Sequence, residues 1–176
     1  MTPAATQAGV PGMIDGYRYT VSLRIWHPHA HPQRFTDALG LSPDGVDVAG
    51  QPRVRKGRTL PTIAKTSYWY RDLGHDPALD VAAFLEARAH ELSPHRALFE
   101  AIAAEGGRAE FFIGLFAERF NCGFDLSPAL QHACADLRLS LGFDVYGYRD
   151  EDESDAAPAR DAAVVAGAGA DGGVSP

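Results

Sequence analysis

Apolar and polar residues alternate through residues 17–26, and this period of two predicts a strand with one buried face. Residues 66–71, 108–118 and 143–148 show the same kind of β-rich or alternating pattern and predict three more strands. In the predicted sheet, one face carries Tyr19, Val21, Leu23, Ile25, Phe111, Ile113, Leu115, Phe143 and Val145.

Helical periodicity separates these strands. Residues 32–39 predict a short helix that ends at Gly40, and residues 79–92 place apolar side chains on one stripe. Ser93-Pro94 and Ser127-Pro128 are typical helix starts, so we expect helices over residues 93–105 and 127–141. Residues 46–61 are expected to be irregular or weakly stranded.

The order of these elements predicts an α+β sandwich. Two strand-helix-strand halves are joined by a helical insert at residues 79–105, and a ferredoxin-like arrangement fits this order. We expect a sheet of about four strands, antiparallel or mixed, with helices on at least one face.

Several short segments, taken in order, resemble one protein family. Residues 37–43 contain an LG-x-x-P pattern, a Gly50 segment follows, and residues 67–69 form a Ser-x-Trp strand after a basic run. The closing helix is followed by Phe-Asp-Val-Tyr at residues 143–146. Over residues 17–149 the chain is similar to domain of unknown function family 4279 (DUF4279). The resemblance implies a small, soluble bacterial domain with no assigned catalytic set, and it suggests immunity-type roles beside toxins.

The two ends of the chain differ in composition from its middle. Of the 176 residues, 150–176 carry seven acids and one arginine, which is −6 of the net charge of −7. We predict a flexible N-terminus at residues 1–15, a single domain at 16–150 and a disordered acidic tail at 151–176. Without a signal peptide, an apolar span or more than two cysteines, a cytoplasmic location is expected.

Three histidines, His27, His29 and His31, form the most conspicuous candidate for chemistry. Alternate residues of an extended chain point the same way, so three imidazoles are able to converge on a transition metal such as zinc. Pro28 and Pro32 favour a plain loop between strand and helix instead. This loop supports the second hypothesis, a metal-binding protein or metal-dependent enzyme.

The second face of the predicted sheet is rich in arginine and aromatic residues, which are typical of binding surfaces. Single-stranded RNA and a protein are both possible ligands for such a face, but the near-neutral charge of residues 1–149 favours a protein. Alternatively, the insert helices or a second subunit cover it. A basic run at residues 53–58 either steers an acidic partner or is an ordinary solvated hairpin or loop, which is the interpretation that the sequence favours. The candidate binding residues are Arg24, Trp26, Arg55, Trp69, Arg71, Phe112, Tyr146 and Tyr148.

No arrangement of acids, serines or cysteines supports a catalytic site. Ser93 and Ser127 are better explained as helix caps, and Cys122 and Cys134 have no partner fixed by sequence spacing. The sequence therefore favours a non-enzymatic domain without a cofactor that binds another macromolecule or itself. Nucleic acid and membrane are not expected as partners.

Overall fold

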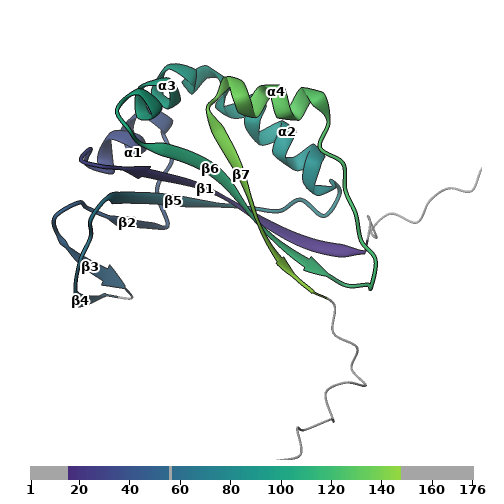
Figure 1. Cartoon of the computed structure of the whole chain (residues 1–176), viewed down its shortest axis with the longest axis horizontal. Helices are drawn as coiled ribbons and strands as arrows, with labels where there is room; N and C mark the ends of the chain where they lie inside the picture. Colours follow the sequence, from purple (N-terminus) through teal and green to yellow (C-terminus); the bar gives the residue numbers. More distant parts are fainter. Residues whose placement is uncertain (1–15, 56, 148–176) are drawn as a thin grey trace, which may run out of the picture.

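The computed structural model describes residues 16–55 and 57–147, which form a sheet covered on one face by helices (Figure 1). The predicted flexible N-terminus and acidic tail lie outside the described residues. The strands are β1 (Tyr17–His27), β2 (Gly45–Asp47), β3 (Pro52–Arg55), β4 (Arg58–Ile63), β5 (Ser67–Gly74), β6 (Arg108–Ala117) and β7 (Leu139–Tyr146). The helices are α1 (Gln33–Leu39), α2 (Val81–Leu92), α3 (Arg96–Ala104) and α4 (Pro128–Asp136).

The main sheet has five strands in the order β2-β5-β1-β6-β7. β1 lies at its centre and pairs antiparallel with β5 and β6, whereas β6 and β7 are parallel and joined by α4. The fold is thus an α+β sandwich with a mixed sheet, as the sequence predicts. In this variant the two parallel strands are direct neighbours, whereas ferredoxin-like sheets are built from split β-α-β units.

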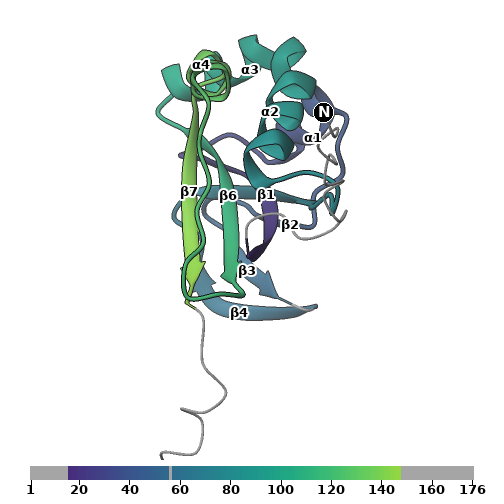
Figure 2. The same ribbon diagram turned by 90° about the vertical axis from the view of Figure 1, so that its right-hand side faces the viewer.

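The helices lie on one face of the sheet, and the hydrophobic core lies between the helices and that face (Figure 2). Odd-numbered residues of β1 point into this core, and Leu23 and Ile25 are fully buried there. Phe111 and Ile113 of β6 lie beside them across the register. This alternation confirms the predicted buried face, except that Val145, near the end of β7, is 59% exposed.

Side-chain caps and left-handed residues set the helix ends. Asp80 accepts the Ala83 N–H at the start of α2, and Ser127 accepts the Leu130 N–H at the start of α4. Gly40 ends α1 with φ of 67°. Ser93 does not cap a new helix, because residues 93–95 form a 3-10 turn that continues α2 into α3.

Residues 46–61, predicted to be irregular or weakly stranded, contain most of β2, all of β3 and most of β4. β3 and β4 pair as a separate hairpin on the side of the main sheet away from the helices (Figures 1 and 2). The last helix ends at Asp136 rather than at Leu141, because Arg138 adopts φ of 54° and β7 begins at once. No helix among the described residues is long and apolar enough to cross a membrane.

Candidate functional site

The face of the main sheet opposite the helices carries arginine and aromatic side chains on four adjacent strands. They are the even-numbered residues of β1, β5, β6 and β7, whose register places them side by side. We call this surface the open face, and its members are Arg18, Thr20, Ser22, Arg24, Trp26, Tyr68, Tyr70, Asp72, Arg108, Glu110, Phe112, Phe116, Ser140, Gly142, Asp144 and Tyr146.

One end of the open face is a row of stacked side chains. The Arg108 guanidinium carbon lies 3.8 Å from the centre of the Trp26 ring. The Trp26 ring packs against Tyr68 at 5.1 Å, and Tyr68 stacks on Tyr70 at 5.7 Å between ring centroids. Cation–π and ring contacts therefore hold these side chains in place before any ligand arrives.

Arg24 occupies the middle of the open face. Its guanidinium carbon lies 3.4 Å from the centre of the Phe112 ring, and its Nε donates to Ser22 Oγ at 3.1 Å. These two contacts fix the guanidinium beside a hollow of about 320 Å³ that Tyr68, Tyr70 and Asp72 also line. The hollow combines a positive charge, two phenol rings and a carboxylate, which suits a mixed polar and apolar ligand.

The far end of the open face is more exposed. Phe116 and Tyr146 stack with centroids 4.7 Å apart, and Tyr146 keeps 49% of its surface exposed. Tyr146 donates its hydroxyl to Asp144 at 2.7 Å, and this hydrogen bond raises the pKa of the Tyr146 phenol. Arg18 pairs there with Glu118 at 2.6 Å.

Positive charge on the open face is fully matched by negative charge. Its three arginines, Arg18, Arg24 and Arg108, share the face with the carboxylates of Asp72, Glu110 and Asp144, and Glu118, which pairs with Arg18, adds a fourth carboxylate at its end. Nucleic-acid affinity depends mainly on neutralising phosphates, so a balanced face does not favour it.

The β3–β4 hairpin adds positive charge on the side of the sheet where the open face lies. Arg53 of the hairpin pairs with the buried Asp47 at 3.6 Å, and Arg58 is exposed. The side chain of Arg55, a predicted binding residue, lies outside the described residues, as does all of Tyr148. The structure therefore bears on neither of these predictions.

The prediction that Trp69 and Arg71 belong to the open face is wrong. Trp69 is 0% exposed, lies in the core and donates its indole N–H to Thr36 Oγ1 of α1 at 3.1 Å. Arg71 shares this side of β5 and contacts the Ser42 carbonyl and Asp44. The sequence Tyr68-Trp69-Tyr70 is aromatic throughout and has no alternation, so its orientation could not be predicted.

Sequence reasoning missed three members of the site, two of them through the reversal of β5. Tyr68 and Tyr70 take the places predicted for Trp69 and Arg71, and Arg108 stacks on Trp26 from the start of β6. A signal was present in the sequence for Arg108 alone, because its position two residues before Glu110 gives it the parity of Phe112. The predicted positions of Arg24, Trp26, Phe112 and Tyr146 on this face are confirmed.

The histidine loop is not arranged as a metal site. The ring of His27 is 4% exposed, and its Nδ1 accepts the Ala30 N–H at 2.8 Å and the His29 N–H at 3.2 Å. The ring proton therefore lies on Nε2, which donates to Glu105 Oε2 at 3.1 Å. Both nitrogens are thus engaged, and within residues 16–55 and 57–147 no three metal-capable side chains form a group.

Instead, His27 is part of a structural junction. Glu105, just after α3, also accepts a bidentate pair of bonds from Arg34 of α1 at 2.6 and 2.8 Å. The Arg34 guanidinium lowers the pKa of Glu105 to about 2, and His27 contributes to this shift. The junction ties the end of β1 to α1 and α3. The predicted convergence of His27, His29 and His31 fails because residues 28–31 turn rather than extend.

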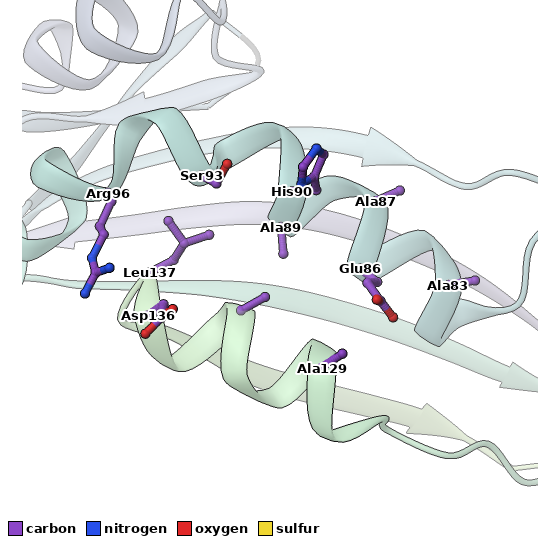
Figure 3. A pocket seen from close by; sticks show the side chains of 11 residues that line it. Ala83, Glu86, Ala87, Ala89, His90, Ser93, Arg96, Ala129, Asp136 and Leu137 are labelled. Atoms are coloured by element: carbon purple, nitrogen blue, oxygen red, sulfur yellow. The ribbon is translucent and has the colours of Figure 1, made fainter.

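A hollow of about 640 Å³ lies between α2 and α4 (Figure 3). Alanines from both helices line it, including Ala83, Ala87 and Ala129. Its two carboxylates, those of Glu86 and Asp136, lie well apart along the groove in Figure 3, so they form no acid–base pair. The hollow is a groove between two packed helices, and its chemistry is less distinctive than that of the open face.

The fold and the open face together define a small α+β domain with one covered and one uncovered sheet face. The family model of DUF4279, a domain of unknown function, matches residues 17–148. The chain therefore belongs to the DUF4279 family. No curated protein and no solved structure matches it.

Proposed function

We propose that this protein is a non-enzymatic binding domain whose open face docks a protein partner. The observation that carries the proposal is the row of stacked arginine and aromatic side chains across β1, β5 and β6. Tryptophan, tyrosine and arginine dominate the energy of protein interfaces, and their side chains are here already held in one arrangement.

Two further features support a protein rather than a nucleic acid. The open face carries at least as many negative as positive side chains. In the hairpin beside it, Arg53 is paired with Asp47, and the exposed Arg58 provides a positive charge that attracts an acidic partner and speeds encounter. Neutralisation of a toxin inside a bacterial cell is the finer form of this proposal, and it rests on the family context.

The experiment is affinity capture with the full chain, followed by binding measurements on the purified captured protein. Trp26→Ala and Arg24→Glu should each weaken the measured affinity at least tenfold, because both remove anchors from the centre of the contact. His90→Ala is the matched control, because His90 is an exposed residue of α2 that lines the α2–α4 hollow on the helix side of the sheet, and it should leave affinity unchanged.

Three results would contradict the proposal. One is equal affinity of the open-face variants and wild type for the captured protein. Another is loss of affinity in the His90→Ala control alone. The third is tight, salt-sensitive binding of a labelled single-stranded RNA in place of any protein.

A further inference from the structure

The outer edge of β7 offers a second and separate surface. β7 is the last strand of the main sheet and pairs along one side with β6, from Ala109↔Leu139 to Phe116↔Tyr146. Along its other side, the backbone groups of β7 have no backbone partner within residues 16–55 and 57–147. An eight-residue strand thus presents a row of free donors and acceptors.

The two edges of the sheet are protected very differently. β2, at the opposite edge, has only three residues. β7 has eight, contains no proline, lysine or arginine, and pairs with β6 without a bulge. Short strands, edge lysines, prolines and bulges are the usual protections against strand pairing, and β7 has none of them. Its single charged residue is Asp144.

Two of the exposed apolar side chains belong to the end of this edge strand, and a third lies in the loop that leads from the neighbouring strand β6. Val145 is 59% exposed, Tyr146 is 49% exposed, and Phe120 in the loop after β6 is 97% exposed. These are half of the large apolar residues that the described part of the chain leaves exposed, the others being Val46, Val54 and Ile63 of β2, β3 and β4. An uncovered apolar edge of this kind marks an association surface.

We propose that β7 pairs antiparallel with β7 of a second copy about a two-fold axis at Gly142. In this register Leu139 faces Val145 of the second copy, and Leu141 faces its Phe143, so apolar side chains meet on the helix-covered side. On the open side Ser140 faces Asp144, and the serine hydroxyl is able to donate to that carboxylate. The strand is self-complementary, as a two-fold interface requires.

The alternation of β7 restricts the possible registers. A slip of one residue would place the helix-side Leu141 and Phe143 opposite open-face residues, so only registers that preserve the faces remain. A slip of two residues that placed Asp144 opposite Gly142 would remove the facing serine hydroxyl and leave that carboxylate only its hydrogen bond from Tyr146. The two-fold axis at Gly142 also places Tyr146 opposite Arg138, giving the exposed ring a cationic neighbour.

The pairing makes one continuous sheet of ten strands from two copies of the five-stranded sheet. Both helix layers lie on one side of it and both open faces on the other. The Phe116–Tyr146 stacks of the two copies then flank the seam. The dimer does not depend on the proposed partner binding, and it leaves Arg24 and Trp26 uncovered.

The oligomeric state of the full chain gives the first test. Light scattering after size exclusion should give about twice the 18.9 kDa of one chain at micromolar concentration. Val145→Lys should return the mass to that of one chain, because it buries a charge against Leu139 of the second copy. Val54→Lys, at a similarly exposed position on β3, is the matched control and should remain dimeric. A monomeric wild type, or a dimer unaffected by Val145→Lys, overturns the proposal.

Cysteine cross-linking tests the register. In a Cys122→Ser background, Gly142→Cys should form a disulfide-linked dimer under copper–phenanthroline oxidation, because the two Cα atoms face each other across the axis. A Cβ at position 142 meets Glu110 and Phe112 only at ordinary contact distances of 3.7 Å, so the substitution is tolerated. Ser140→Cys is the matched control and should not link, since four residues of offset separate the paired atoms by more than about 7 Å. Linking through Ser140→Cys and not Gly142→Cys would overturn the register.

Discussion

The two faces of the central sheet are built from the same strands, yet they are stabilised in different ways. On the helix-covered face, Leu23, Phe111 and Ile113 are fully buried among apolar neighbours. On the open face, Arg24, Trp26 and Phe112 are only partly buried, and guanidinium groups stack on the rings, Arg24 on Phe112 and Arg108 on Trp26. Side chains alternate between the two faces along each strand, and this alternation separates the residues that stabilise the fold from those available for binding.

The largest expected difference is between the two tryptophans. Trp69→Ala should cost about 3–5 kcal/mol of unfolding free energy, because it removes a fully buried ring and its hydrogen bond to Thr36. Trp26→Ala should cost roughly 1–2 kcal/mol, the value of its contacts with Arg108 and Tyr68. Urea denaturation of both variants measures this difference. Equal costs would mean that the two faces are equally covered.

Two glycines of the sheet region differ in how much space a methyl group would have at their positions. A Cβ at Gly107 would lie 2.8 Å from both the Trp26 carbonyl oxygen and Ile102 Cγ2, so Gly107→Ala should destabilise the protein by about 1–3 kcal/mol. Gly142→Ala meets only ordinary contacts and should be neutral or stabilising by up to about 1 kcal/mol. Thermal unfolding of the pair checks this, and a more stable Gly107→Ala variant would contradict the packing described here.

The junction at the end of β1 makes stability depend on acidity. The pKa of Glu105 is about 2 in the folded protein against 4.5 ordinarily, so its contribution is fully present above about pH 4.5. This contribution should be lost as the pH falls from 4.5 towards 2, as the carboxylate that binds Arg34 and His27 becomes protonated. In Glu105→Gln, unfolding free energy measured over this range should fall less steeply. An unchanged slope would exclude Glu105 as the cause.

The smallest expected effect concerns the two thiols. Cys134 lies on the buried side of α4, and burial raises the pKa of its thiol to about 11. It should therefore resist iodoacetamide at pH 8 until the protein unfolds, while the partly exposed Cys122 is labelled first. Mass spectrometry of timed digests follows both sites. Early labelling of Cys134 would show that α4 opens readily from the sheet.

The sequence predicted the covered face well and the open face only in part. Strict alternation in β1 fixed the orientation of Leu23 and Arg24 without further information. In β5 three consecutive aromatics left the orientation open, and only the antiparallel register with β1 places Tyr68 beside Trp26. For residues 53–58 the sequence left a hairpin or a loop open, because residues 46–61 have no apolar alternation, and the β3–β4 strands pair with each other rather than with the main sheet.

The histidine prediction failed for a different reason. Alternate spacing suggested converging rings, but backbone N–H groups of the turn bind His27 Nδ1 and hold that ring inward. Glu105 completes the junction, and it follows Arg34 by 71 residues and His27 by 78 residues in the chain. Contacts across such separations depend on the folded arrangement, which periodicity does not encode.

Acrylamide quenching of tryptophan fluorescence tests whether the open face binds the partner. The chain has only two tryptophans, so each is followed separately once the other is replaced. In Trp69→Phe, Trp26 fluorescence should be quenched readily in the free protein and protected once the captured protein partner is bound. In Trp26→Phe, Trp69 should resist quenching in both states. A partner that binds without changing the quenching of Trp26 would contradict the assignment of the open face as the binding surface.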